Sequence, residues 1–227
     1  MLNFDFIFFH IPKCGGSSIR EYFKRIFLNL KYRDHTIYIS IEGKKIHNLT
    51  DENKLNLMLP KLKKTKILLS HINCNLYEKL NSKFRITCIR NPIDRYISSF
   101  NHFELLEDSS KNLIDLFLKK KISIFNIYDS DIWLRKNYKD YNYIIIFENL
   151  ENDLNEINKI LKINFKIKIP NINPGIKNVN KKNYFKFNFN KKYHKDIYEF
   201  LKKKLQPDIL IYNEICKIKG LDYLKIK

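Results

Sequence analysis

Apolar and polar positions alternate along the chain in short blocks that predict an α/β fold. Apolar runs of roughly four to eight residues, rich in Ile and Phe, are typical of strands buried on both faces. Such strands are predicted at residues 4–11, 36–41, 66–70, 84–89 and 143–147. Because helical spacing prevails between these runs, the pattern indicates a P-loop-like, three-layer fold with a central parallel sheet flanked by helices.

Helices are expected between and after the strands. They are predicted at residues 17–30, 50–59, 92–103, 111–120, 125–138, 149–161, 194–205 and 208–217, with one or two helical turns at 73–80. Ser17 or Ser18 is expected to cap the first helix, as serine commonly does. Pro60 is expected to follow the second helix, and Pro207 to separate the last two, since proline interrupts helices.

The chain of 227 residues is long enough for one domain with a sizeable core, and its hydrophobic fraction of 44% is typical of globular proteins. No stretch approaches ~20 uninterrupted apolar residues, so no membrane span is expected. The apolar start leads directly into a glycine-containing loop and is interpreted as a strand instead of a signal peptide. We therefore expect a single domain over residues 1–227, located in the cytoplasm, with C-terminal helices in residues 194–227.

Residues 170–193 differ in composition from the rest of the chain. They are rich in Asn, Lys and Phe and show no clear period. A long ordered loop is the preferred interpretation, because such loops in compact domains are often functional. Disorder is the competing interpretation.

Cysteine spacing and net charge restrict the possible functions only in part. Cys14, Cys74, Cys88 and Cys216 form no C-x-x-C pair, so no zinc site is expected, and reduced thiols agree with a cytoplasmic protein. The formal net charge of +19 suits polyanionic partners such as nucleic acid, acidic glycans and anionic membranes. A solvated lysine-rich surface explains the same charge equally well.

The stretch from Phe8 to Ser18 combines the parts of a phosphate-binding loop. It reads F-F-H-I-P-K-C-G-G-S-S and joins an apolar run to a predicted helix. Gly15 and Gly16 let backbone N–H groups approach an anion closely, the helix presents its positive end, and Lys13 adds a full charge. In a Walker A loop the lysine follows the last glycine. Lys13 precedes both glycines, so the pattern predicts a phosphate-binding loop of another kind.

A second anion site is predicted where the apolar run 84–89 meets the next helix. Pro92 suits the first turn of that helix. Arg90 then lies at the end of the strand, and Ser98 lies about two turns into the helix. A guanidinium and a hydroxyl so placed can hold a phosphate. Two separate anion sites indicate a ligand with phosphates at both ends.

The two motifs together resemble those of the sulfotransferases. The run Pro12-Lys13-x-Gly15-Gly16-Ser17-Ser18 is similar to their 5′-phosphosulfate loop. The run Arg90-x-Pro92-x-x-Arg95-x-x-Ser98-x-Phe100 is similar to their 3′-phosphate motif. The resemblance is greatest for the Golgi-type carbohydrate branch, which includes heparan sulfate 2-O-sulfotransferase. It covers roughly the first half of the chain well, and residues 143–154 and the C-terminal helices weakly.

This resemblance implies a donor, a reaction and a set of binding residues. The donor is 3′-phosphoadenosine 5′-phosphosulfate (PAPS), the acceptor is a hydroxyl group, preferably on a glycan, and no metal is implied. The residues implied to bind the 5′ end are Lys13, Cys14, Gly15, Gly16, Ser17 and Ser18, and those implied to bind the 3′-phosphate are Arg90 and Ser98. The loop at 170–193 would help to cover the nucleotide, and no obligate nucleic-acid partner is expected.

Lys13 and His71 are the candidate catalytic residues. Lys13 can stabilise the charge that builds on the leaving phosphate oxygen. His71 follows the apolar run 66–70, and sites of parallel sheets collect at the carboxyl ends of strands. It also falls where the 2-O-sulfotransferases have a catalytic histidine, so it is expected to be the general base. Glu21 and His102 remain alternative bases, whereas His10 is expected to orient the backbone.

Two other classes of function stay open at this point. A P-loop kinase or nucleotidase would need Mg²⁺ held by an acidic residue at a strand end, and only Glu148 follows a predicted strand. A basic nucleic-acid-binding protein on the same fold could use the Tyr, Phe and Lys residues of 183–193 to stack on bases. Cys14 could be a reactive thiol, but a residue that fills the loop is the preferred interpretation.

Overall fold

The computed structural model describes residues 2–33, 37–39, 52–71, 79–103, 138–165, 167–169, 191 and 194–221. The chain forms two compact units. The first comprises residues 1–89 and 129–173, and the second comprises residues 90–128 and 174–227. That residues 1–227 act as a single domain stays a prediction. In the described part of the chain, no helix combines the length and the apolar character that crossing a bilayer requires.

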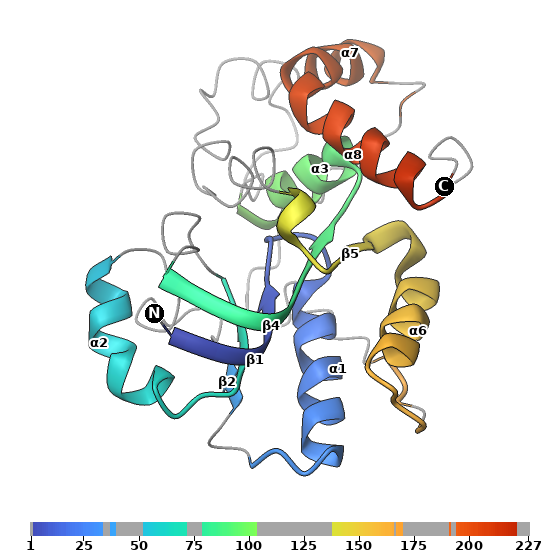
Figure 1. The fold of residues 1–227 in the computed structure, drawn as a ribbon. Coiled ribbons are helices and arrows are strands. Elements are labelled where there is room, and N and C mark those ends of the chain that lie inside the picture. The colour runs from blue at the N-terminus through green and yellow to red at the C-terminus, as the bar shows by residue number, and fades with distance from the viewer. Residues whose placement is uncertain are drawn as a thin grey trace, which may run out of the picture. The chain divides into compact units, whose positions relative to one another are not determined.

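The first unit is built on a five-stranded parallel sheet (Figure 1), which confirms the predicted α/β class. Its strands are β1 (Leu2–Phe9), β2 (Ile37–Ile39), β3 (Ile67–Ser70), β4 (Leu80–Ile89) and β5 (Tyr143–Ile146). They lie in the order β2-β3-β1-β4-β5, and every neighbouring pair is parallel. The central strand β1 pairs Phe9 with Ser70 of β3 and with Thr87 of β4. All carboxyl ends therefore meet at one edge of the sheet.

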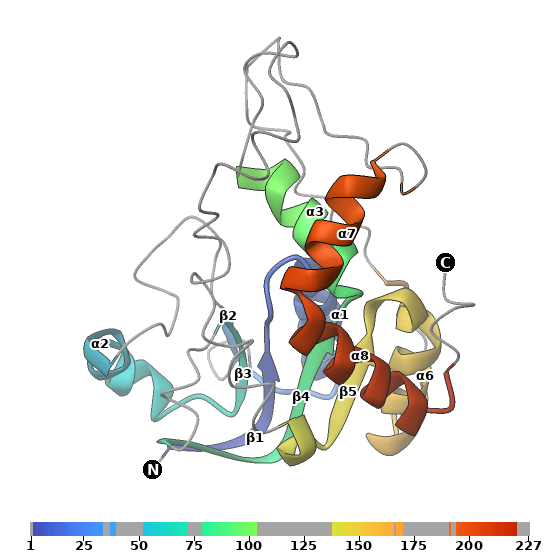
Figure 2. The ribbon, with the colours of Figure 1, turned by 90° about the horizontal axis from the view of Figure 1, so that it is seen from above.

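Helices cover both faces of this sheet. They are α1 (Gly16–Asn29), α2 (Glu52–Leu62) and α6 (Leu150–Ile160), with short 3-10 turns at Tyr138–Asp140 and Phe147–Asn149. The Asn158 side chain of α6 donates a 2.7 Å hydrogen bond to the hydroxyl of Tyr22 in α1, so these two helices share a face. Helix α2 lies on the opposite face (Figures 1 and 2).

A bulge in β1 distributes its phenylalanines over both faces of the sheet. The N–H groups of Asp5 and Phe6 both donate to the carbonyl of Lys66, at 2.8 and 3.4 Å. Two consecutive residues that share one partner in this way form a bulge, which shifts the alternation of side chains. Phe6 packs against Phe23 of α1, whereas Phe4 joins the cluster on α2. In a regular strand, Phe4 and Phe6 would face the same layer.

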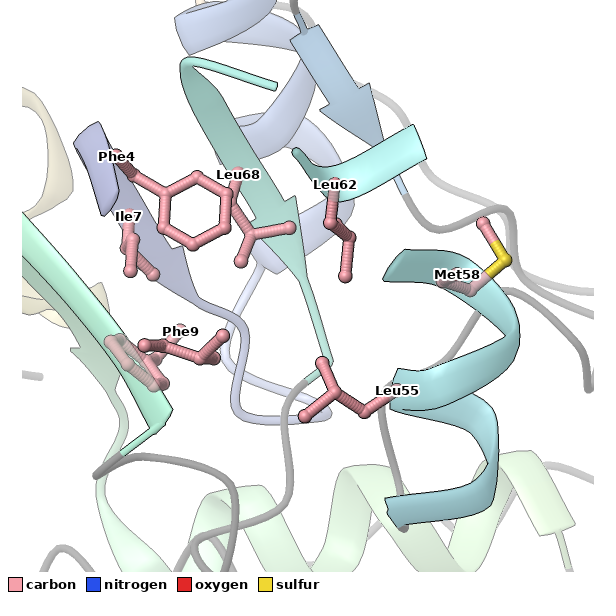
Figure 3. Close-up of a cluster of buried hydrophobic side chains, with 8 residues drawn as sticks. Phe4, Ile7, Phe9, Leu55, Met58, Leu62 and Leu68 are labelled. Carbon is pink, nitrogen blue, oxygen red and sulfur yellow. The ribbon is translucent and has the colours of Figure 1, made fainter. Parts of the chain in front are cut away.

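Apolar packing holds α2 on the sheet (Figure 3). The cluster consists of Phe4, Ile7, Phe9, Leu55, Met58, Leu62, Leu68 and Leu80. The prediction that α2 ends before Pro60 is wrong, because this proline lies inside the helix. Leu62 lies beyond it and is 1% exposed. Burial of such a side chain gains about 1.5–3 kcal/mol, which offsets much of the ~3 kcal/mol that an internal proline costs.

The start of β4 also differs from expectation. Residues 73–80 were expected to form helical turns, but Leu80 already belongs to β4 and pairs with Leu2 of β1. Leu80 is fully buried, so tertiary pairing extends this strand toward its N-terminus well beyond the apolar run at 84–89. The remaining residues of the expected turns lie outside the described part of the chain, apart from Lys79.

The second unit contains helices α3 (Pro92–Phe103), α7 (Lys195–Lys204) and α8 (Gln206–Ile218) among its described residues. Its apolar cluster consists of Ile93, Tyr96, Ile97, Ile197, Leu201 and Leu205. Pro207 lies in the first turn of α8, where the missing N–H group costs nothing, and not between two helices as predicted. The helices predicted at 111–120 and 125–138 and the loop predicted at 170–193 lie almost wholly outside the described residues.

The carboxylate of Asp153 joins β5 to α6. It is 2% exposed and accepts hydrogen bonds from the Ile146 N–H at 2.6 Å, the Asn149 side chain at 3.1 Å and the Tyr143 hydroxyl at 3.2 Å. Burial, together with the nearby carboxylate, raises the pKa of Tyr143 well above its ordinary value. These bonds fix the junction in which Phe147 lies.

Replacement of Asp153 by alanine is expected to lower the free energy of unfolding by about 3 kcal/mol. The substitution leaves the buried Ile146 N–H without its charged acceptor. Urea denaturation measures this change. Glu151→Ala removes an exposed carboxylate from the same helical turn and should change stability by less than about 0.5 kcal/mol. Similar losses in the two variants would show that the buried bonds are not important.

Candidate active site

The loop between β1 and α1 has a backbone that few residue types adopt. Lys13 and Gly15 both have left-handed conformations, with φ of 65° and 72°. Gly15 is the N-cap of α1, and no side chain caps this helix end. The prediction that Ser17 or Ser18 is the cap is therefore wrong. The first helical hydrogen bond runs from the Ile19 N–H to the Gly15 carbonyl at 3.2 Å, so the preceding N–H groups have no acceptor within the helix and suit an anion.

Two aromatic rings occupy the space that side chains at Gly15 and Gly16 would need. A Cβ atom on Gly15 would collide with the ring of Phe147, which follows β5. A Cβ atom on Gly16 would collide with the imidazole of His10, which follows β1 and is 4% exposed. The main chain of the loop therefore lies directly on these two rings, at the carboxyl edge of the sheet.

His10 and His71 stack on each other at the ends of the adjacent strands β1 and β3. Their ring centroids are 3.8 Å apart, and the ring planes differ by 24°. Nδ1 of His71 lies 2.9 Å from the main-chain oxygen of His10. Because a carbonyl oxygen only accepts hydrogen bonds, Nδ1 carries the proton in this contact. The His10 N–H in turn donates to the Ser70 carbonyl at 2.9 Å, which continues the strand pairing up to the two rings.

The electrostatic surroundings keep His10 uncharged. Burial, followed by the neighbouring His71, Arg20 and Lys13, lowers the pKa of His10 well below its ordinary value of 6.5. Two unit charges about 4 Å apart repel each other by about 4 kcal/mol at an effective dielectric constant of 20. A stack with both imidazoles protonated is therefore strongly disfavoured.

Arg20 is a buried cation beside the glycine loop that was not among the residues predicted for the site. It lies in the first turns of α1, is 7% exposed, and donates from Nη2 to the Ser17 hydroxyl at 3.3 Å. Arginine is rarely so buried unless it is paired. The spacing of three residues from Ser17, which places both on one side of a helix, is the signal that could have identified it.

The side chain of Cys14 is buried inside the loop, which favours the interpretation that it fills the loop. Its side chain is fully buried, its thiol lies 3.7 Å from the Pro12 carbonyl, and its own carbonyl accepts the S–H of Cys88 at 3.0 Å. Only the main chain of Cys14 is available to a ligand. No group of three His, Cys, Asp or Glu side chains in the described part of the chain is arranged to hold a metal ion.

The alternative bases differ from His71 in their surroundings. The carboxylate of Glu21 is bound by Arg25, one turn further along α1, at 3.0 Å, and both side chains are partly exposed. His71, by contrast, stacks on the ring that contacts Gly16. The backbone of His102 belongs to α3, and its side chain lies outside the described part of the structure.

The residues of the second motif belong to the second unit. Arg90 directly follows β4 along the chain, and the next residue, Asn91, accepts the N–H groups of Ile93 and Asp94 at 3.1 and 3.3 Å. These bonds satisfy the start of α3. An anion near this helix end would therefore be bound by side chains, and the half-buried Arg90 and Ser98 have suitable donors.

The chain matches the model of a known protein family. A family model described as the sulfotransferase family matches residues 3–126, which is more than half of the 227 residues. The matched segment includes the glycine loop, His71 and the segment from Arg90 to Phe100. No curated protein gives a significant match.

Gly15→Ala is expected to lower the free energy of unfolding by about 3 kcal/mol or more. A left-handed conformation costs an alanine about 1–2 kcal/mol, and the collision with Phe147 adds about 1–3 kcal/mol. Gly220 provides a matched control, because it has φ of 67° and nothing within 4 Å of its added Cβ. Gly220→Ala should therefore show only the first cost. If denaturation gives equal losses for the two variants, the ring of Phe147 does not restrict the loop.

Proposed function

Because the chain belongs to the sulfotransferase family, whose members transfer sulfuryl groups, we propose that it moves the sulfuryl group of PAPS to a hydroxyl acceptor. The observation that carries this proposal is the geometry of the glycine loop. Gly15 leaves the start of α1 without a side-chain cap, and the main chain there lies against His10 and Phe147. The positive charges of Lys13 and Arg20 lie near enough to the His10 ring to lower its pKa. Such a helix end suits a phosphosulfate.

The 5′ end of the donor binds to this loop. The N–H groups from Gly15 to Ser18 hold the 5′-phosphate, and the ammonium of Lys13 neutralises the bridging oxygen. In the reaction, the bond between sulfur and that oxygen breaks, and its electron pair stays on the phosphate. A new bond forms between sulfur and the acceptor oxygen. The stabilisation of charge on the departing oxygen is the largest single contribution that the protein can make.

The 3′-phosphate of the same nucleotide binds to Arg90 and Ser98. Asn91 already occupies the first N–H groups of α3, so the interaction is made by side chains. A guanidinium forms two parallel hydrogen bonds with a phosphate, and a hydroxyl adds a third. Recognition of this second phosphate would distinguish PAPS from ATP.

His71 accepts the proton of the acceptor hydroxyl as the new bond to sulfur forms. Its Nδ1 is engaged with the His10 carbonyl, which leaves Nε2 as the basic atom. The acceptor itself is proposed to be a glycan. The resemblance of the two motifs to the Golgi-type carbohydrate branch supports this choice, and a net charge of +19 would favour an acidic glycan.

Lys13→Ala is expected to reduce sulfuryl transfer by about 100- to 1000-fold, as the loss of one charge-stabilising donor does. The measurement is the release of adenosine 3′,5′-bisphosphate from PAPS in the presence of a mixture of glycan acceptors. Lys31 is a matched control, because it is exposed and shares the left-handed backbone of Lys13, with φ of 64°. Lys31→Ala should retain the wild-type rate. Wild-type turnover in Lys13→Ala would exclude the proposed role.

Arg90→Ala is expected to weaken the binding of adenosine 3′,5′-bisphosphate by about 10- to 100-fold, since hydrogen bonds to charged groups are worth about 1.5–3 kcal/mol. The affinity for AMP, which lacks the 3′-phosphate, should stay unchanged. Calorimetry with both nucleotides, with ATP as a third ligand and a chelator present, measures these affinities. Arg25→Ala, which removes an exposed guanidinium, is the control. Equal losses for AMP and the bisphosphate, or tighter binding of ATP, would contradict the donor assignment.

A further inference from the structure

We propose that His10 is a positioning residue that sets His71 up as a proton acceptor. Its main-chain carbonyl keeps the one proton of neutral His71 on Nδ1, and its uncharged ring holds the His71 ring in place by stacking. The lone pair of the neutral His71 ring is then on Nε2. The inference rests on the proposed function, because it assigns the general base to His71.

The hydrogen bond to His71 determines its tautomer. Nδ1 lies 2.9 Å from the oxygen of His10, and that oxygen cannot donate. A neutral imidazole in this position keeps its proton on Nδ1, because the hydrogen bond made by one ring nitrogen determines the state of the other. The lone pair is therefore on Nε2. A proton from an acceptor hydroxyl would go to that atom while the bond between sulfur and the phosphate oxygen breaks.

The position of His10 is fixed on several sides. Its N–H donates to the Ser70 carbonyl at 2.9 Å. Its ring stacks on His71 and also lies nearly parallel to Phe8, with centroids 5.8 Å apart and planes 13° apart. Gly16 closes the remaining edge, since any side chain there would collide with Cδ2 and Nε2 of His10. A ring held in this way can orient a neighbour but has little room to move with a substrate.

The charges around His10 oppose its protonation. The groups that face it are the cations Lys13 and Arg20 and the second imidazole, His71. Its own Nδ1 is buried and has no hydrogen-bond partner among the described residues. A proton on that nitrogen would place an unsolvated charge beside other cations. His10 therefore remains neutral, and the proton acceptor of the pair is His71.

The first test measures the tautomer directly and needs no substrate. The full chain labelled with ¹⁵N-histidine gives two-bond ¹H–¹⁵N spectra, in which the signals of His10 and His71 are identified by their loss in His10→Phe and His71→Phe. We expect His71 to be the Nδ1–H tautomer when neutral, and His10 to remain neutral below pH 6.5. An Nε2–H tautomer at His71, or a His10 that titrates before His71, would overturn the proposal.

The second test separates positioning from chemistry. His10→Phe keeps the main-chain carbonyl and a stacking ring but removes both ring nitrogens, so it should retain the Nδ1–H tautomer at His71 and reduce kcat by less than about tenfold. His71→Phe should reduce kcat by about 100-fold or more, with unchanged affinity for adenosine 3′,5′-bisphosphate. Equal losses of kcat in the two variants would show that His10 itself carries the proton and would overturn the proposal.

These measurements distinguish failure of the inference from failure of the proposed function. If the bisphosphate does not bind to the wild-type protein, the sulfotransferase donor is wrongly assigned, whatever the tautomer is. If the bisphosphate binds and His71 is found as the Nε2–H tautomer, the donor assignment holds and the role of His10 is wrong.

Discussion

The contact between the glycine loop and two aromatic rings is the constraint on which the candidate site depends. The rings of Phe147 and His10 occupy the space where Gly15 and Gly16 would carry side chains. The main chain of the loop can therefore pack directly against these rings at the carboxyl edge of the sheet, where α1 begins. A side chain at either position would lift the first turn away from the edge and change the direction of its N–H groups. The same contact places the loop beside the imidazole pair.

The position of His10 follows from the phase of β1. The bulge at Asp5 and Phe6 shifts the alternation so that Phe6 and Phe8 face α1. His10 continues this row and ends against Gly16, the first residue of α1. Without the bulge, the row facing α1 would lose its match to the apolar face of that helix. A local irregularity near the start of the strand is thus linked to the geometry of the site.

Much of this arrangement could be predicted from the sequence because it is local. Apolar runs, together with a weak alternation at 36–41, identified the five strands of the described part of the chain, although β4 begins earlier than expected. The glycine loop was placed correctly between β1 and α1. The features that could not be predicted depend on tertiary contacts. Gly15 caps α1 where a serine was expected, because the loop adopts a left-handed turn between two rings. Pro60 is tolerated within α2 because Leu62 is buried beyond it.

The candidate site shows the same division. Lys13 and the glycines are contiguous, so their motif is readable, and His71 was found from its place after an apolar run. The burial of Arg20 and the stack of His10 on His71 arise only when separate strands are brought together. The sequence of β1 alone does not indicate that His10, at its end, contacts His71, which follows β3. The sequence therefore offered Lys13, the glycines and His71 as candidates, but not the contacts that their side chains make with each other.

Both the fold and the proposed chemistry require a flat, uncharged side chain at position 10. The close approach of Gly16 requires a flat ring there, and the cations Lys13 and Arg20 require that this ring stay uncharged. A carboxylate at this position would neutralise the positive charge of Lys13 and Arg20, which an anionic donor needs. A lysine would have no flat face to pack against Gly16. A neutral imidazole meets both conditions, and its backbone carbonyl is left to hold His71. The loop that would bind the donor and the histidine that would take the acceptor proton are therefore coupled through one buried ring.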